Sequence, residues 1–165
     1  MFTVILNRRC LLALMLLVLS VNTTVGYRVG YQRELEIKLF FSNPELPAYP
    51  DDCGAGVFVK RKIPATRQVA DAALKMLFKG PTVEEKANGM AGNAPLGDYY
   101  LGVKIKKGEA IVNFRRGAEK YLHVSGAICE QEMVLTPIVK TLKQFSPIKS
   151  VDYAIEGRII TEWDA

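Results

Sequence analysis

The sequence predicts an α+β domain with a small mixed or antiparallel sheet, two helices packed on one face of that sheet and one disulfide. Three features carry this prediction: segments in which apolar and polar residues alternate, two segments with helical spacing of apolar residues, and two cysteines that remain once an N-terminal signal is set aside. Of the 165 residues, 49% are hydrophobic and 24% are charged. This composition favours one globular core and excludes a disordered or fibrous chain.

The N-terminal segment is typical of a secretion signal. Arg8 and Arg9 precede an apolar stretch over 10–21, which is shorter than the roughly 20 residues that span a bilayer. We expect residues 1–26 to be a signal peptide; the alternative is an uncleaved membrane anchor. Both place the domain outside the cytoplasm, as a secreted, periplasmic or membrane-anchored protein.

The remaining chain divides into a linker over 27–33, one domain over 34–160 and a tail over 161–165. Alternation predicts strands over 34–41 and 57–63, joined by a proline-containing loop. A helix is expected to begin near Thr66 and to end at Gly80-Pro81, where a left-handed cap is followed by a residue that cannot continue a helix.

The second half is predicted to complete the sheet. Residues 82–98 are expected to form an irregular connection with one helical turn at most. Strands over 99–105 and 110–114 flank a glycine-containing turn, and 151–156 alternates again. Between them, 128–145 has a helical apolar stripe interrupted by Pro137, which predicts a kinked or two-part helix.

Cys53 and Cys129 are the two cysteines that follow the signal segment. An exported domain with two cysteines is expected to pair them, and the alternative is two separate buried thiols. Two cysteines and the single histidine do not readily supply a metal site. No metal and no cofactor are therefore predicted.

The chain offers little for catalysis. His123 and Ser125 lie two residues apart, but no acid orienter, oxyanion hole or G-x-S-x-G motif accompanies them. Asp51-Asp52 and Glu84-Glu85 are interpreted as solvated loop charge, because neither pair belongs to a recognisable acidic motif. No catalytic residue is predicted, and a small envelope hydrolase is the least favoured class.

Four lysines alternate on two of the predicted strands: Lys60, Lys62, Lys104 and Lys106. If they share one sheet face, that face could bind an anionic wall polymer, lipid head groups or an acidic partner. The alternative is an ordinary solvated face, since lysines also deter edge pairing. Removal of residues 1–26 lowers the net charge from +5 to +3, so no nucleic-acid partner is expected.

Several motifs along the predicted domain occur in a recognisable combination. The most specific are the Gly80-Pro81 pair after the first helix and the Thr141-Leu142-Lys143-Gln144-Phe145 run in the second. The others are Asp52-Cys53, Val57 to Arg61, Thr82 with Glu84-Glu85, Gly108 to Phe114, and Cys129. Together these motifs resemble the GerMN (sporulation and spore germination) domain family. Asn113 and Pro137 depart from the family pattern, which usually has aspartate and glutamine there.

The resemblance implies a small α+β fold, similar to ring-building modules of secretion machinery, that acts through protein assembly or modulation of envelope signalling and is not an established enzyme. The expected function is therefore a non-enzymatic extracytoplasmic interaction or assembly module. Its partner would be an envelope protein or a second copy of the chain. The alternative is a module that binds an anionic envelope polymer through the basic sheet face.

Overall fold

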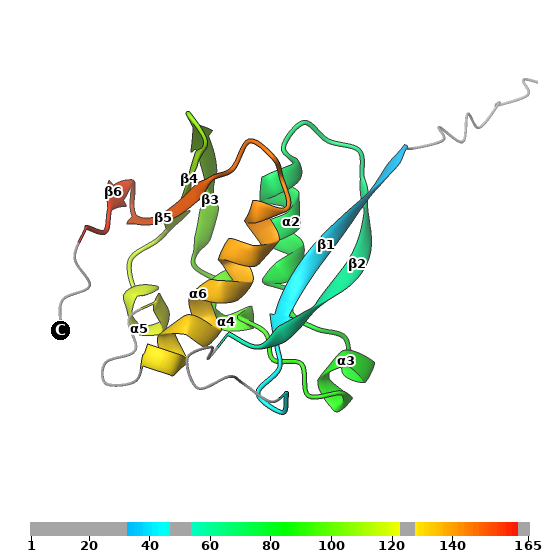
Figure 1. Cartoon of the computed structure of the whole chain (residues 1–165). Helices are drawn as coiled ribbons and strands as arrows, with labels where there is room; N and C mark the ends of the chain where they lie inside the picture. The colour runs from blue at the N-terminus through cyan, green and yellow to red at the C-terminus, as the bar shows by residue number, and fades with distance from the viewer. Residues whose placement is uncertain (1–32, 47–53, 123–127, 162–165) are drawn as a thin grey trace, which may run out of the picture. The chain divides into compact units, whose positions relative to one another are not determined.

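Six strands and five helices form the part of the chain that the computed structural model describes, residues 33–46, 54–122 and 128–161 (Figure 1). The strands are β1 (Glu34–Ser42), β2 (Gly56–Pro64), β3 (Tyr100–Lys106), β4 (Glu109–Phe114), β5 (Ser150–Ile155) and β6 (Arg158–Ile159). The helices are α2 (Val69–Leu77), α3 (Val83–Ala87), α4 (Ala94–Gly97), α5 (Glu119–Leu122) and α6 (Ile128–Lys143).

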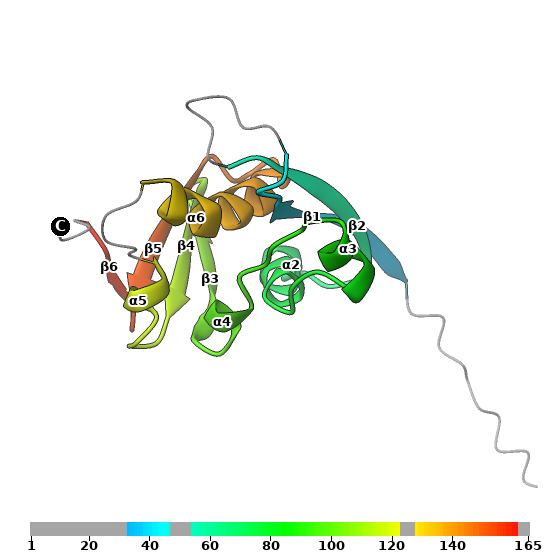
Figure 2. The same ribbon diagram turned by 90° about the horizontal axis from the view of Figure 1, so that it is seen from below.

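The strands form two sheets and not the single sheet that the sequence predicted. β1 and β2 pair antiparallel as a two-stranded sheet, and the second sheet has the order β3-β4-β5-β6. Within it only β4 and β5 run parallel, connected through α5 and α6. Helices α2 and α6 pack on each other and contact both sheets, so they lie between the sheets (Figure 2). The α+β class holds, but the predicted arrangement of helices on one face of one sheet was wrong.

The disulfide that formed part of the predicted fold class is likewise not supported by the structure. Cys129 lies in the first turn of α6 with an exposed side chain, and Cys53 falls outside the described residues. The predicted Cys53–Cys129 bond therefore lies only partly within the described residues, whose elements are held together by core packing and hydrogen bonds.

Aromatic side chains join α2 to the four-stranded sheet. The ring of Phe78, directly after α2, lies 5.1 Å from the ring of Tyr100 on β3 and 5.9 Å from that of Phe114 on β4, between ring centroids. Such tilted and edge-on pairs add to the free energy gained by burial. On the other side of the helices, Leu39 and Phe41 of β1 are completely buried in the same core.

Two side chains, one in the last turn of α6 and one directly after it, occupy the outer edge of β1. The hydroxyl oxygen of Thr141 accepts a hydrogen bond from the Phe40 backbone N–H at 3.0 Å. The Gln144 amide accepts from the Lys38 N–H at 2.8 Å and donates to the Lys38 carbonyl at 2.6 Å. Gln144 therefore makes the two bonds that a residue of a neighbouring antiparallel strand would make.

Helix α6 is continuous through Pro137, so the two-part alternative was wrong. Proline lacks the N–H that would bond to the carbonyl oxygen four residues earlier, which here is that of Met133. The buried hydroxyl of Ser42, at the end of β1, donates to this oxygen at 3.1 Å. The amide of Asn93 similarly donates to the carbonyl of Val134 at 2.5 Å. Side chains from outside the helix thus supply donors where the proline interrupts it.

Residues 82–98 are more ordered than the sequence predicted, because they contain α3 and α4. Thr82 caps α3: its hydroxyl accepts from the Glu85 N–H at 3.2 Å, and the Glu85 carboxylate accepts from the Thr82 N–H at 2.9 Å. This reciprocal pair is a capping box. A proline in the first turn of α4, where no N–H partner is needed, favours that helix start.

The bond from Ser42 to Met133 can be tested by a double-mutant cycle with Pro137. We expect Ser42→Ala to lower the free energy of unfolding by about 1 kcal/mol, because it leaves a partly buried carbonyl without a donor. In a Pro137→Ala background the new N–H supplies that donor, so the same change should cost under about 0.5 kcal/mol. Chemical denaturation measures both. Ser150→Ala, at an exposed strand start, is the control; equal costs in the two backgrounds would contradict the interpretation.

Candidate functional site

A groove of about 480 Å³ lies between the first half of α2 and the outer edge of β3. Figure 2 shows these two elements side by side, with β3 at the border of its sheet. Its apolar lining comes from both sides, chiefly Val69 on α2 and Val103 and Ile105 on β3. A concave apolar surface with polar groups at its margin is the usual form of a binding site.

The charged side chains that line the groove are mostly basic. Arg67 and Lys104 are exposed and form no ion pair within the described residues, whereas Lys75 pairs with Asp71 at 2.8 Å. Asp71 also accepts a hydrogen bond from the Tyr100 hydroxyl at 2.8 Å. Burial, and then this carboxylate, raise the pKa of Tyr100, so the phenol stays protonated and donates. The one acidic group is therefore already engaged, and the groove presents positive charge.

The edge of β3 that borders the groove has no neighbouring strand. β3 and β4 are joined by a two-residue turn in which Lys107 (φ +53°) and Gly108 (φ +88°) are left-handed, as in a type I′ hairpin. In such a hairpin the flanking pair, Lys106 and Glu109, exchanges both backbone bonds, and so does every second pair. The N–H and C=O groups of Val103 and Ile105 therefore point away from β4, towards the open edge.

The structure does not bring the four predicted lysines onto one sheet. Lys60 and Lys62 lie on β2, where Lys60 pairs with Glu36 of β1 at 2.9 Å and Lys62 with Glu34 at 3.5 Å. Lys104 and Lys106 lie on β3 in the other sheet and are exposed. The lysines of β2 are therefore neutralised by nearby glutamates, and only the two lysines of β3 lie next to the groove.

The residues of the two sequence motifs have structural positions. Gly80 has φ of +81° after α2, and Pro81 follows it buried. At the end of α6 and directly after it, Thr141 and Gln144 bond to the edge of β1, Leu142 is completely buried and Phe145 packs against the core. These motifs hold helices in place and do not line the groove.

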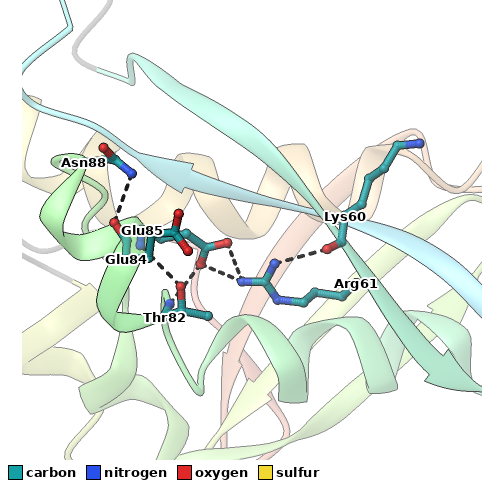
Figure 3. A network of polar contacts seen from close by, with 6 residues as sticks. All are labelled: Lys60, Arg61, Thr82, Glu84, Glu85 and Asn88. Atoms are coloured by element: carbon teal, nitrogen blue, oxygen red, sulfur yellow. Dashed lines mark hydrogen bonds and ion pairs between the residues drawn. The ribbon is translucent and has the colours of Figure 1, made fainter.

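Glu85 is not a solvated loop charge, in contrast to the sequence-based interpretation. Besides capping α3, its carboxylate receives both bonds from one guanidinium nitrogen of Arg61 on β2, at 2.7 and 2.5 Å, as Figure 3 shows. The Glu85 side chain is 15% exposed and the Arg61 side chain is 22% exposed. The Arg61 hydrogen bond lowers the pKa of Glu85, which keeps it ionised. The arrangement ties α3 to the two-stranded sheet.

Other residues considered from the sequence lie outside the described ranges: His123, Ser125, Asp51 and Asp52. Within the described ranges, no group of three or more histidine, cysteine, aspartate or glutamate residues could hold a metal ion. None of the helices in that part of the chain is both long and apolar enough to cross a bilayer.

Asn113, one of the two departures from the family pattern, acts as an acceptor within the sheet. Its side-chain oxygen receives the Gly157 N–H at 2.8 Å, in the turn between β5 and β6. Asn113 also lines the groove, because Gly102 opposite it on β3 carries no side chain. The groove therefore reaches past the edge strand to β4.

The fold and the groove define a small α+β module with an open sheet edge. A model of the Germane family, described as sporulation and spore germination, matches residues 38–161. The chain therefore belongs to this family, as its motifs predicted. No curated protein matches the chain.

Solved structures of GerMN domains share this fold. The first GerMN domain of the sporulation protein GerM from Bacillus subtilis is 26% identical, with a TM-score of 0.56 over 79% of this chain and 90% of that one. The tandem GerMN domains of the same protein are 24% identical, with a TM-score of 0.57 over 81% of this chain. The chain spans 43% of that tandem structure.

Neither the groove nor the Arg61–Glu85 ion pair was predicted from the sequence. The groove depends on which strand ends at the border of a sheet, and no local pattern gives that. The capping box, in contrast, could have been found, because Thr82 followed three residues later by Glu85 is its signature.

The pH dependence of stability tests the Arg61–Glu85 pair. Because the folded-state pKa of Glu85 lies below its ordinary value of 4.5, the pair contributes stability above about pH 4.5 and loses it as the pH falls through the folded-state pKa. We expect Glu85→Gln to cost about 1 kcal/mol at pH 7 and the difference from the unmodified protein to shrink as the pH falls below about 4.5. Urea denaturation at several pH values measures this.

Glu84→Gln is the matched control, since this exposed neighbour has no ion pair among the described residues. It should change the free energy of unfolding by less than about 0.5 kcal/mol at pH 7. A Glu85→Gln effect that does not shrink at any acid pH at which the protein stays folded would show that the charge on Glu85 is not what matters.

Proposed function

We propose that this protein is a non-enzymatic interaction and assembly module that works outside the cytoplasm, in the cell envelope, and that it binds a protein partner at the groove between α2 and β3. The observation that carries the proposal is the combination of an apolar, basic-rimmed groove with an open strand edge. A concave apolar surface beside unpaired backbone groups suits recognition of another polypeptide.

The sequence supports the cellular location. The basic and apolar N-terminal segment over 1–26 has the character of a secretion signal, and its alternative, an uncleaved anchor, leads to the same side of the membrane. The resemblance to GerMN domains supports the assembly role, since known members act through protein assembly or modulation of envelope signalling. The related GerM of Bacillus subtilis is a sporulation protein, which makes an envelope complex of a differentiating cell the first place to look.

A second candidate function is the binding of an anionic envelope polymer. Exposed Lys104 and Lys106 on β3 favour it; Lys104 contributes more, because Lys106 lies opposite Glu109 of β4. Lys60 and Lys62 contribute less, since Glu36 and Glu34 neutralise them locally. Such binding would fall steeply with ionic strength, because exposed charges are screened.

Site-specific crosslinking in intact cells tests the leading proposal. A photo-crosslinking residue in place of Leu101, beside the groove, should capture a defined protein partner with the full-length chain. Ile159 is the matched control, because its side chain is 48% exposed against 51% for Leu101 and lies at the opposite border of the same sheet. Crosslinking from position 159 should be absent or at least about tenfold weaker, since binding energy concentrates in a small part of an interface.

Two outcomes would contradict the proposal. Recovery of the chain only with wall polymer or lipid, in a salt-sensitive manner, would favour the second candidate. A hydrolytic activity of the purified protein that His123→Ala or Ser125→Ala abolishes would replace the interaction module with an enzyme.

A further inference from the structure

The open edge of β3 has a defined pattern of side chains and backbone groups. The backbone N–H and C=O groups of Val103 and Ile105 point to the edge, and the edge is open along the regularly paired part of the strand, about five residues, Gly102–Lys106, or about 17 Å. The β1 edge differs, because Thr141 of α6 and Gln144, directly after this helix, already bond to its backbone. Within the described residues, β3 therefore has an open strand edge that borders the groove.

Side chains on β3 alternate between two faces of the sheet. Val103 and Ile105 pair with Val112 and Ala110, which are completely buried on the helix-covered face. Lys104 projects from the opposite face. A strand added beside β3 would place its own side chains in the same alternation, so apolar residues would meet Val69 and Ile105 and acidic ones would lie next to Lys104.

We propose that the groove binds an extended segment of a partner protein in which acidic and apolar residues alternate, and that this segment adds to β3 as a fifth strand of the sheet. The inference rests on the proposed function and specifies its surface and its partner. Backbone bonds to Val103 and Ile105 supply affinity that does not depend on sequence, while the apolar lining and the charges of Arg67 and Lys104 select the sequence.

Charge argues against a second copy of the chain as the occupant. If two β3 edges paired, Lys104 and Lys106 of one copy would lie near the same residues of the other. Like charges facing one another across strands are destabilising. An acidic partner strand removes this repulsion and replaces it with attraction, so the same lysines oppose self-pairing and favour the proposed ligand.

A synthetic peptide of three glutamate–valine repeats, blocked at both ends and carrying a fluorophore, tests the proposal. Fluorescence anisotropy with the full-length protein in mild detergent should show saturable binding. A peptide of the same composition with its glutamates and valines in separate blocks should bind at least about tenfold more weakly, because it cannot satisfy both faces of the strand. Higher ionic strength should weaken binding of the alternating peptide.

Backbone methylation of the peptide tests strand addition directly. In an extended strand, the N–H groups of the glutamates point to one edge and those of the valines to the other. One methylated isomer, either at all glutamates or at all valines, should lose binding, and the other should retain it. Which isomer fails also gives the direction of the added strand. Equal binding, or equal loss, of the two isomers would overturn strand addition.

Charge-reversal variants locate the binding site. Arg67→Glu and Lys104→Glu should each weaken peptide binding by about fivefold or more, since each replaces an attraction with a repulsion. Arg158→Glu makes the same charge change on β6, at the other border of the sheet, and should leave binding unchanged. All three positions are exposed, and circular dichroism checks that the fold is retained. An equal effect of Arg158→Glu would overturn the assignment to the groove.

The outcomes separate this inference from the proposed function. If the alternating peptide fails to bind while crosslinking from position 101 still captures a protein in cells, strand addition is wrong and the interaction module stands. If the captured protein is a second copy, the acidic partner is wrong. If neither binding nor capture occurs, both proposals fail.

Discussion

The hydrogen bonds between α6 and the edge of β1 hold the two halves of this domain together. β1 and β2 form an isolated two-stranded sheet, and such a ribbon is marginally stable in water by itself. Thr141 and Gln144 supply the bonds that a third strand would supply, and Ser42 bonds back to α6 where Pro137 leaves a carbonyl without its helical donor. These contacts fix the small sheet to the helix layer, which in turn packs on the four-stranded sheet. The groove exists because α2 is held in this layer beside β3.

Much of the local structure was predictable because it depends on neighbouring residues. The alternation of Leu35, Ile37 and Leu39 identified β1, and the Gly80-Pro81 stop identified the end of the first helical segment. The division into two sheets was not predictable, because alternation shows which face of a strand is buried but not which strand pairs with which. Phe40 illustrates the limit: it falls on the face that alternation assigns to solvent. It is nevertheless only 3% exposed, because Phe58 and Lys140 pack against its ring.

The same limit applies to the candidate site. Four lysines on alternate positions of two strands suggested one basic face, but that conclusion required the strands to be neighbours in one sheet. β2 and β3 belong to different sheets, so the lysines divide into a pair neutralised by glutamates of β1 and a pair beside the groove. Pro137 was misjudged for a related reason. Its effect on α6 depends on a hydroxyl from β1, which is 95 residues away in the chain.

The outer edges of β1 and β3 differ in whether another strand can bind there. An unpaired strand edge tends to associate with any other edge, and proteins usually cover it or charge it. Here α6 covers the edge of β1 with side-chain hydrogen bonds that leave little for a partner to form. The edge of β3 is not covered by α2, which stands away from it across the groove, and its lysines protect it instead. The side-chain hydrogen bonds at the edge of β1 exclude any partner strand, whereas the lysines at the edge of β3 repel only positively charged strands. An edge protected by lysines therefore remains open to an acidic strand, and this difference places the binding surface on β3.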